Sequence, residues 1–271
     1  MTVLTFPSVI PSGFSFKLRP HSQSFSSPLT GSTQTLDTPG AALWYANIDF
    51  EDTNALEGRT LMAFLANLDG TAGRFSLSPL HHPTPAGVAT GTPIINGGSC
   101  QTTSSYAIGE TTIGVDTATR DFEVGEYVKF DDHEAVYLLV TGTVSGTLEL
   151  QAGGLEVAVA NNAVARVFHQ GKKIKTKGWT QGTAGLLLVG DFFEINGELK
   201  IVTVQVDSDD VAAGTADIYF APPLRDTIAE TTAVVVTNPK ATMRLMDDDQ
   251  AAQDYYGPII TNTSISCVEA F

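Results

Sequence analysis

The residues of this chain that could do chemistry are mostly carboxylates and histidines in short clusters. Asp131, Asp132, His133 and Glu134 follow one another, and both carboxylate and imidazole groups bind divalent ions. Adjacent residues of a strand point to opposite faces, however, and this cluster stands where a hairpin should turn. We therefore interpret it as a turn and expect no metal there.

Three further clusters have the composition of a metal site but not its pattern. Residues 207–210, Asp-Ser-Asp-Asp, lack the glycine at position six and the distal glutamate that a calcium loop requires. The acidic residues 247–249 have no second ligand cluster. His81 and His82 precede Pro83 on an extended segment, where the two rings would diverge. We interpret all three as polar turns or loops, and we expect no metal and no cofactor.

Motifs of common enzyme classes are absent from the sequence. It contains no Gly-x-Ser-x-Gly elbow, no Gly-x-Gly-x-x-Gly and no phosphate loop that ends in Gly-Lys-Ser/Thr. The two carboxylates of a glycoside hydrolase come together in the folded protein and need not be close in the sequence. The presence of 30 acidic residues therefore neither supports nor excludes glycoside hydrolysis. We expect a protein without catalytic activity, with a hydrolase of cell-wall polymer as the remote alternative.

The one basic run of the chain is Lys172, Lys173, Lys175 and Lys177, and Trp179 follows it. A charged linker would explain this run. A patch that docks an acidic neighbouring subunit would explain it too, since the rest of the chain is acidic. Lysines beside a tryptophan also suit nucleic acid, but the overall charge argues against that partner.

Several aromatic residues could line a sugar-binding face. Aromatic residues of β proteins are more often anchors of a core or an interface, so we keep glycan binding as an alternative. The residues concerned are Trp44, Tyr45, Trp179, Tyr255 and Tyr256.

The charge and composition of the chain exclude several classes of partner. Its formal net charge is −15 over 271 residues, whereas nucleic acid and anionic membrane surfaces attract basic proteins. We expect no signal peptide and no membrane-spanning helix, because no basic and apolar leader and no apolar run of about 18 residues occurs. Cys100 and Cys267 are expected to be free, buried thiols of a protein made in the cytoplasm.

Periodicity predicts one helix and many strands. Leu61, Phe64, Leu65 and Leu68 have helical spacing, Asn54 and Glu57 match a capping box, and Asp69-Gly70 follows, so a helix is expected over residues 55–68. Residues 74–77 read as a strand. Four prolines and four glycines interrupt residues 79–99, and we place a domain boundary near residue 95.

Residues 95–238 read as an inserted outer β region that contains a weak repeat. Residues 122–130 resemble residues 187–195, and two further pairs follow at similar offsets. The predicted units are 100–170 and 178–238, each a β-barrel or meander. Residues 239–271 hold two more strands, which we expect to complete the sheet of residues 1–94. The predicted fold is therefore mainly β with one α-helix, a β-sandwich-type domain carrying an insertion.

The early segment from Phe14 to Trp44 looks built to join other subunits. After alternating strand residues, a polar run of Ser, Gln, Thr, Pro and Gly holds two large apolar anchors, Phe25 and Leu29. Such a segment buries too little apolar surface to order itself, so it should become ordered by lying on its own domain or on a neighbouring subunit. The candidate subunit-interface residues are Phe16, Leu18, Gln23, Phe25, Pro28, Leu29, Gln34, Trp44, Lys172, Lys173, Lys175 and Trp179.

These residues resemble a family of distal tail and minor tail proteins from long-tailed bacteriophages. The resemblance rests on Phe16-Lys-Leu18, on residues 23–35, on the helix and the strand after it, and on Gly178-Trp179 and residues 221–225 (Ala-Pro-Pro-Leu-Arg). It spans most of the chain, and its motifs are structural.

The resemblance implies a structural virion protein that forms a ring, usually a hexamer, at the distal end of the tail tube. Its partners would be copies of itself, the tube protein and the hub or tip proteins, and its location would be the phage tail. A host-surface glycan is a further partner under the alternative, in which residues 95–238 bind carbohydrate.

Overall fold

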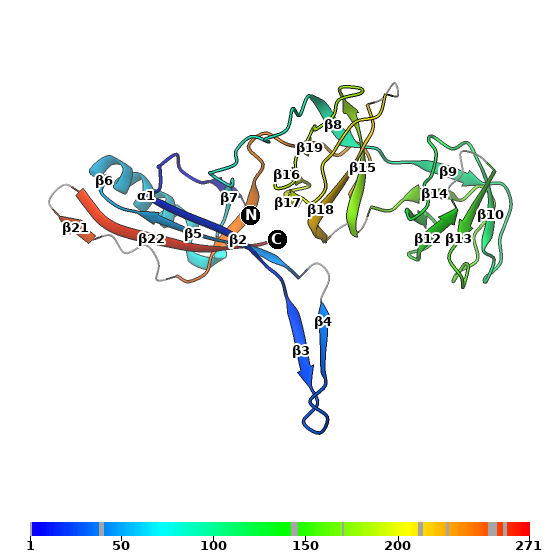
Figure 1. Ribbon diagram of the computed structural model, residues 1–271, viewed down its shortest axis with the longest axis horizontal. Helices are drawn as coiled ribbons and strands as arrows, with labels where there is room; N and C mark the ends of the chain where they lie inside the picture. Colours follow the sequence, from blue (N-terminus) through cyan, green and yellow to red (C-terminus); the bar gives the residue numbers. More distant parts are fainter. Residues whose placement is uncertain are drawn as a thin grey trace. The chain divides into compact units, whose positions relative to one another are not determined.

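The computed structural model has a mainly β fold with one helix (Figure 1). It describes residues 2–37, 41–141, 146–169, 171–210, 214–225, 228–248, 254–256 and 259–271. The chain forms two compact units. The first contains residues 1–86, 189–202 and 235–271, and the second contains residues 87–188 and 203–234.

The first unit is built on an eight-stranded sheet whose central order is β1-β7-β20-β22-β5-β2, with β21 and β6 paired to β22. C-terminal strands therefore complete the N-terminal sheet, as the sequence predicted. The strands are β1 (Val3–Thr5), β2 (Gly13–Arg19), β5 (Leu43–Phe50), β6 (Thr53–Asn54), β7 (Arg74–Leu77), β20 (Ala241–Leu245), β21 (Asp254–Tyr256) and β22 (Ile259–Glu269).

Helix α1 (Ala55–Leu68) has the predicted bounds and the predicted cap. The side chain of Asn54 accepts hydrogen bonds from the backbone of Leu56 and Glu57, and Glu57 bonds back to the Asn54 amide. Asp69 ends the helix in the left-handed conformation, and the 3₁₀ turn η1 (Gly70–Ala72) follows. The cap satisfies donors that a helix start would otherwise leave open.

The core of the first unit lies on one face of this sheet. Alternate residues of β5 are buried, from Trp44 to Phe50, and the apolar stripe of α1 joins the same cluster. Phe192 and Leu199, from the hairpin of β16 (Phe192–Ile195) and β17 (Glu198–Val202), belong to this cluster too. The same hairpin also belongs to a sheet of the inserted region, where the sequence placed it.

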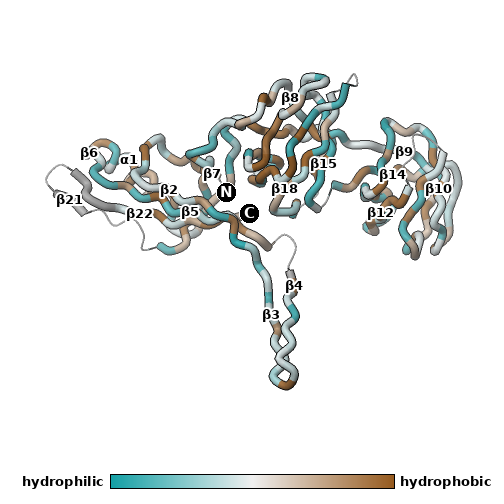
Figure 2. The backbone as a smooth tube through the Cα atoms, in the orientation of Figure 1, coloured by the Kyte–Doolittle hydropathy of each residue, from teal (hydrophilic) through white to brown (hydrophobic). Residues whose placement is uncertain are grey.

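The polar early segment forms a separate hairpin of β3 (Ser22–Ser26) and β4 (Thr33–Asp37). The two strands pair only with each other among the described residues, in an unbroken register from Ser22–Asp37 to Ser26–Thr33. The tube of this hairpin is mostly pale or teal, with brown at its tip (Figure 2). We call it the β3–β4 arm.

Two six-stranded sheets make up the inserted region. The first is a closed barrel of β9 (Ser99–Thr102), β10 (Thr112–Asp116), β11 (Tyr127–Phe130), β12 (Val136–Thr141), β13 (Gly146–Leu150) and β14 (Val164–Val167), in the order β10-β13-β12-β11-β14-β9. The second has the order β19-β16-β17-β18-β15-β8 and adds β8 (Gly91–Ile95), β15 (Gly171–Trp179), β18 (Ala216–Leu224) and β19 (Val234–Val235) to the β16–β17 hairpin.

The two sheets are versions of one design, which confirms the predicted pair of similar units. Matching β9–β14 to β8 and β15–β19 in chain order reproduces the same strand order in both. The details of the first hairpin also agree. Gly125 donates to the Leu139 carbonyl and Gly190 to the Val202 carbonyl, each at 2.9 Å, and both glycines have positive φ, 88° and 97°.

In the sequence, the first barrel is inserted within the second sheet: β8 comes first, then all of β9–β14, and then β15. Entry and exit lie side by side at this insertion. The Asn96 amide donates to the Lys175 carbonyl at 2.9 Å, and the Val167 amide donates to the Gly98 carbonyl at 2.8 Å. An insertion with paired ends leaves the surrounding sheet continuous.

Candidate functional site

The tip of the β3–β4 arm is an ordered turn that holds apolar side chains in solvent. The Ser27 amide donates to the Ser32 carbonyl and the Gly31 amide to the Ser27 carbonyl, both at 2.9 Å, and the Thr30 amide reaches the Ser27 hydroxyl at 3.3 Å. Gly31 has a φ of 66°, which a glycine adopts without strain. These bonds therefore fix the backbone of the tip, from which Leu29 protrudes.

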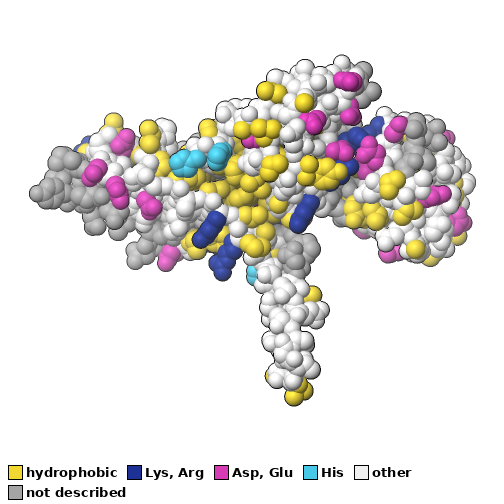
Figure 3. All heavy atoms as spheres, in the orientation of Figure 1, with side chains coloured by type: hydrophobic (Ala, Val, Ile, Leu, Met, Phe, Trp, Pro, Cys, Tyr) yellow, Lys and Arg dark blue, Asp and Glu magenta, His cyan; other side chains and the backbone are white. Residues whose placement is uncertain are grey.

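The predicted interface residues of the arm are all exposed. Leu29 is 95% exposed and Phe25 is 55% exposed, while Gln23, Pro28 and Gln34 also face solvent. The described part of the arm carries yellow only near its tip and side, with no dark blue or magenta (Figure 3). Between Ser22 and Leu36 the arm thus presents an uncharged surface with a few apolar points.

The predicted interface residues at the base of the arm lie inside the first unit. The Trp44 ring stacks on Phe16 with 4.9 Å between centroids, and its Nε1 donates to the Leu199 carbonyl at 2.9 Å. Trp44 is only 3% exposed, and Phe16 and Leu18 pack against the same core. These residues support the base of the arm, and Phe16 and Leu18 stay partly exposed there.

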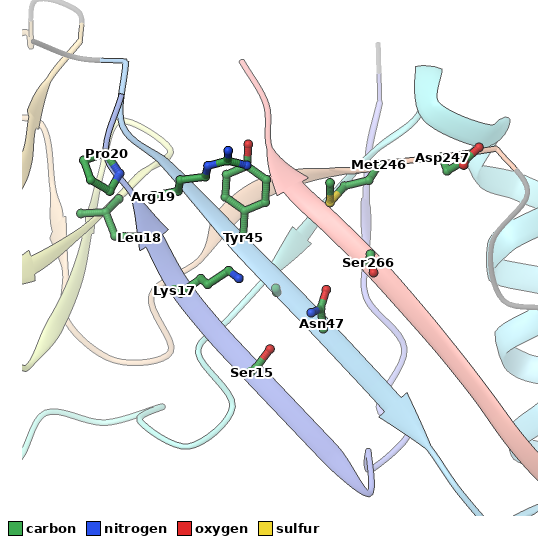
Figure 4. Close-up of a pocket in the computed structure, with 11 residues that line it drawn as sticks. Ser15, Lys17, Leu18, Arg19, Pro20, Tyr45, Asn47, Met246, Asp247 and Ser266 are labelled. Atoms are coloured by element: carbon green, nitrogen blue, oxygen red, sulfur yellow. The ribbon is translucent and has the colours of Figure 1, made fainter. Parts of the chain in front are cut away.

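The sheet face opposite the core carries a polar pocket of 720 Å³, beside the start of the arm. Figure 4 shows Lys17, Arg19, Tyr45 and Asn47 on this face, along β2 and β5. The Arg19 guanidinium carbon lies 5.6 Å from the centre of the Tyr45 ring. The carboxylate residue Asp247 also lines this pocket. This face carries both signs of charge and can bind a polar partner.

A second hollow of the first unit, of 350 Å³, is apolar. Its wall is aromatic: Phe14 stacks on Phe16 at 5.9 Å, His81 meets Phe14 edge-on at 5.7 Å, and His82 lies 6.1 Å from Phe192. We call it the apolar pocket, and it is lined by Phe14, Phe16, Pro79, His81, His82, Gly190, Phe192 and Ile201.

Sequence reasoning missed the apolar pocket because its lining comes from three distant parts of the chain. The histidine pair itself lies at a turn, as predicted, since the His82 amide donates to the Pro79 carbonyl at 2.9 Å. The signal in the sequence that could have indicated the pocket is the pair His81 and His82, whose rings are amphipathic and which stand between two prolines.

The basic run lies on strand β15 of the second unit and not in a linker. Lys173 forms an ion pair with Asp217 at 2.7 Å, and both Lys173 and Lys175 approach Glu123. Burial would raise the pKa of Glu123, but the hydrogen bond and charge of Lys175 and the charge of Lys173 outweigh it and hold that pKa below its usual value. Much of this positive charge is therefore balanced within the unit, although Lys172 is exposed.

The aromatic residues considered for a sugar-binding face are not gathered in one place. Trp179, in the second unit, is 4% exposed and donates from Nε1 to the Thr176 hydroxyl at 2.8 Å. Trp44 is buried in the first unit, whereas Tyr45 lies on the polar pocket. The side chains of Tyr255 and Tyr256 lie outside the described residues.

The acidic clusters serve as turns in the described structure. Asp131 and Asp132 begin the turn between β11 and β12, and Arg166 reaches Asp131 at 3.2 Å. Asp207 accepts from the Gly185 amide at 2.6 Å, and that bond lowers the pKa of its carboxyl.

Asp248 holds another turn, because it accepts from the Thr71 amide at 2.6 Å. Asp249 lies outside the described residues. No group of three or more metal-binding side chains occurs among the residues that the structure describes.

Both cysteines are free and buried. Burial raises the pKa of the Cys100 thiol and of the Cys267 thiol to about 12. Each therefore stays protonated near neutral pH and reacts slowly. None of the described helices is long and apolar enough to cross a membrane.

The chain was compared with protein-family models and with curated proteins, and neither comparison gave a match.

Proposed function

We propose that this chain is a structural subunit of a bacteriophage tail that assembles with copies of itself into a ring at the distal end of the tail tube. The observation that carries the proposal is the β3–β4 arm. It is a hairpin whose strands pair only with each other within the described residues, and its ordered tip exposes Leu29.

An isolated two-stranded hairpin is at best marginally stable in water. The arm has one side-chain hydrogen bond across its ladder, between Ser24 and Thr35 at 3.1 Å, and no buried described side chain. A surface supplied by a neighbour would bury Phe25 and Leu29 and stabilise the ladder. The arm is therefore suited to assembly, while the resemblance to tail proteins supplies the setting.

Ring assembly needs one patch of a subunit to meet a different patch of the next. The first unit offers such patches separately: the arm, the polar pocket with Lys17 and Arg19, and the edge strands β1 and β2. Exposed strand edges can accept the backbone of another chain. In the tail, the other partners would be the tube protein and the hub or tip proteins, and the subunit would have no catalytic role.

The test removes the arm without disturbing the sheet. Arg19 pairs with Leu43 in the β2–β5 ladder, so residues 20–42 can be replaced by Asn-Gly, which favours a two-residue hairpin turn. Native mass spectrometry and electron microscopy should show rings of the intact chain and only monomers of the shortened chain. Circular dichroism provides the control that the shortened chain is folded. Rings formed equally well without the arm would refute the proposal.

A further inference from the structure

We propose that the apolar pocket is the socket for the tip of the β3–β4 arm of a second copy, with Leu29 as the inserted side chain. This inference rests on the proposed function, because it names where the arm of one subunit binds the next.

The charge of the chain favours this pairing of surfaces. Two copies each carry a net charge of −15 and repel one another over most of their surface. The arm has no Asp, Glu, Lys or Arg between Ser22 and Leu36, and none of these residue types lines the apolar pocket. The tip and the pocket can therefore approach each other without bringing like charges together.

The shapes are complementary as well. Leu29 protrudes from the turn as a single aliphatic side chain, and the pocket is an open hollow with aromatic walls formed by Phe14, Phe16 and Phe192. An aliphatic or aromatic anchor in a preformed pocket, surrounded by weaker contacts, is the usual energetic centre of an interface. Here the polar strands of the arm would supply those surrounding contacts.

The length of the arm points to a second copy and away from its own pocket. Nine residues separate Pro20 from Leu29, about 30 Å along an extended strand. Phe16 and Phe14 stand only four and six residues before Pro20, about 13 to 20 Å away along β2. An arm folded back with its ladder intact would carry Leu29 past its own pocket, whereas the arm of a neighbour has no such restriction.

The neighbouring edge of the sheet supports the same site. Strand β2 carries two of the pocket residues, and among the described residues it pairs only with β5. Its other edge can accept backbone hydrogen bonds from an arriving strand. A neighbour's arm lying along this edge would have its tip guided toward the pocket.

A mixing experiment tests the socket directly in the full-length chain. One preparation carries Leu29→Cys and a second, isotopically labelled preparation carries His82→Cys; His82 is exposed, so its replacement should not disturb the core. The native thiols are buried and do not compete. After mixing and mild oxidation, mass spectrometry should find disulfides that join position 29 of one isotope to position 82 of the other.

The matched control moves one cysteine away from the pocket. Leu56→Cys places a thiol on α1, where Leu56 is 74% exposed, and its crosslinking with Leu29→Cys should stay at background. In parallel, Leu29→Ala should weaken self-association by about tenfold to a hundredfold, the loss expected from removing one buried aliphatic side chain. Leu56→Ala should leave association unchanged.

The outcomes separate this inference from the proposed function. Rings that form without the 29–82 disulfide, and that tolerate Leu29→Ala, would overturn the socket and leave ring assembly standing. A chain that carries both Leu29→Cys and His82→Cys gives a further outcome. If its dilute monomer forms the disulfide within one chain, the pocket binds the arm of the same chain and not that of a second copy. An intact chain that stays monomeric at all concentrations would overturn both.

Discussion

His169 makes the stability of the second unit depend on pH. It lies between β14 and β15, is 5% exposed, and within the described residues its Nε2 has no hydrogen-bond partner. Burial, assisted by the positive charge of Arg120, lowers the pKa of this histidine from 6.5 to about 4. The perturbation we consider is acidification from pH 7 to pH 5, compared between the native chain and a His169→Leu variant.

The sign and size of the effect follow from proton binding. The unfolded chain takes up a proton at this histidine near pH 6.5, whereas the folded chain takes it up only near pH 4. The stabilisation is therefore complete above pH 6.5 and is lost as the pH falls toward 4. One pKa unit corresponds to about 1.4 kcal/mol, so the native chain should lose about 2 kcal/mol between pH 7 and pH 5 through this group.

The assay uses the single tryptophan of each unit. Replacing Trp44 by Phe in both proteins leaves Trp179, in the second unit, as the fluorescent reporter of urea unfolding. The range stops at pH 5, where carboxylates with a lowered pKa, such as Glu123, are still largely ionised. The native chain should lose more stability than the variant, by the stated amount. Parallel pH profiles of the two proteins would refute the buried, neutral histidine.

Four further substitutions test the local structure. Asn54→Ala removes the cap of α1 and should lower the free energy of unfolding of the first unit by about 1 kcal/mol in urea titrations. Trp44→Phe leaves the Leu199 carbonyl without its indole donor, and a loss of roughly 1–3 kcal/mol is expected from the same measurement. In Gly125→Ala and Gly190→Ala the new side chain has open space, but the alanine must adopt the positive φ of the glycine that it replaces. Thermal unfolding should therefore show similar losses of stability, about 1 kcal/mol each. A large difference between the two variants would argue against equivalent turns.

Local signals predicted the elements of this fold well. The capping box at Asn54 and Glu57 placed α1. Asn196-Gly197 adopts positive φ angles of 51° and 77°, which suit the hairpin turn that this dipeptide favours. The repeat predicted two similar units, because equivalent turns need the same small residues at Gly125 and Gly190. In each case the residues that determine the structure are close together in the sequence.

Long-range contacts could not be predicted in this way. The hydrogen bond from Trp44 to Leu199 spans 155 residues and places the β16–β17 hairpin in the core of the first unit. Phe192 and Leu199 look like ordinary strand residues, so their sequence says nothing about which core they enter. The apolar pocket was missed for the same reason.

The early segment shows both sides of this limit. Its polar composition predicted that it would bury too little apolar surface to order itself, and Phe25 and Leu29 are exposed in the structure. The composition did not predict a hairpin, because Ser, Gln and Thr residues carry little strand periodicity. The register depends on the turn from Ser27 to Ser32, whose hydrogen bonds only the folded chain reveals.

The nested insertion has a consequence for how such a protein can change over generations. A backbone hydrogen bond joins Asn96 to Lys175. The stretch between them could therefore be lost, gained or exchanged in one genetic event without breaking the surrounding strands. Natural variants that differ in this inner barrel alone could therefore keep the same arm and sheet. Selection could then change the inner barrel while the arm and the sheet of the first unit are inherited unaltered.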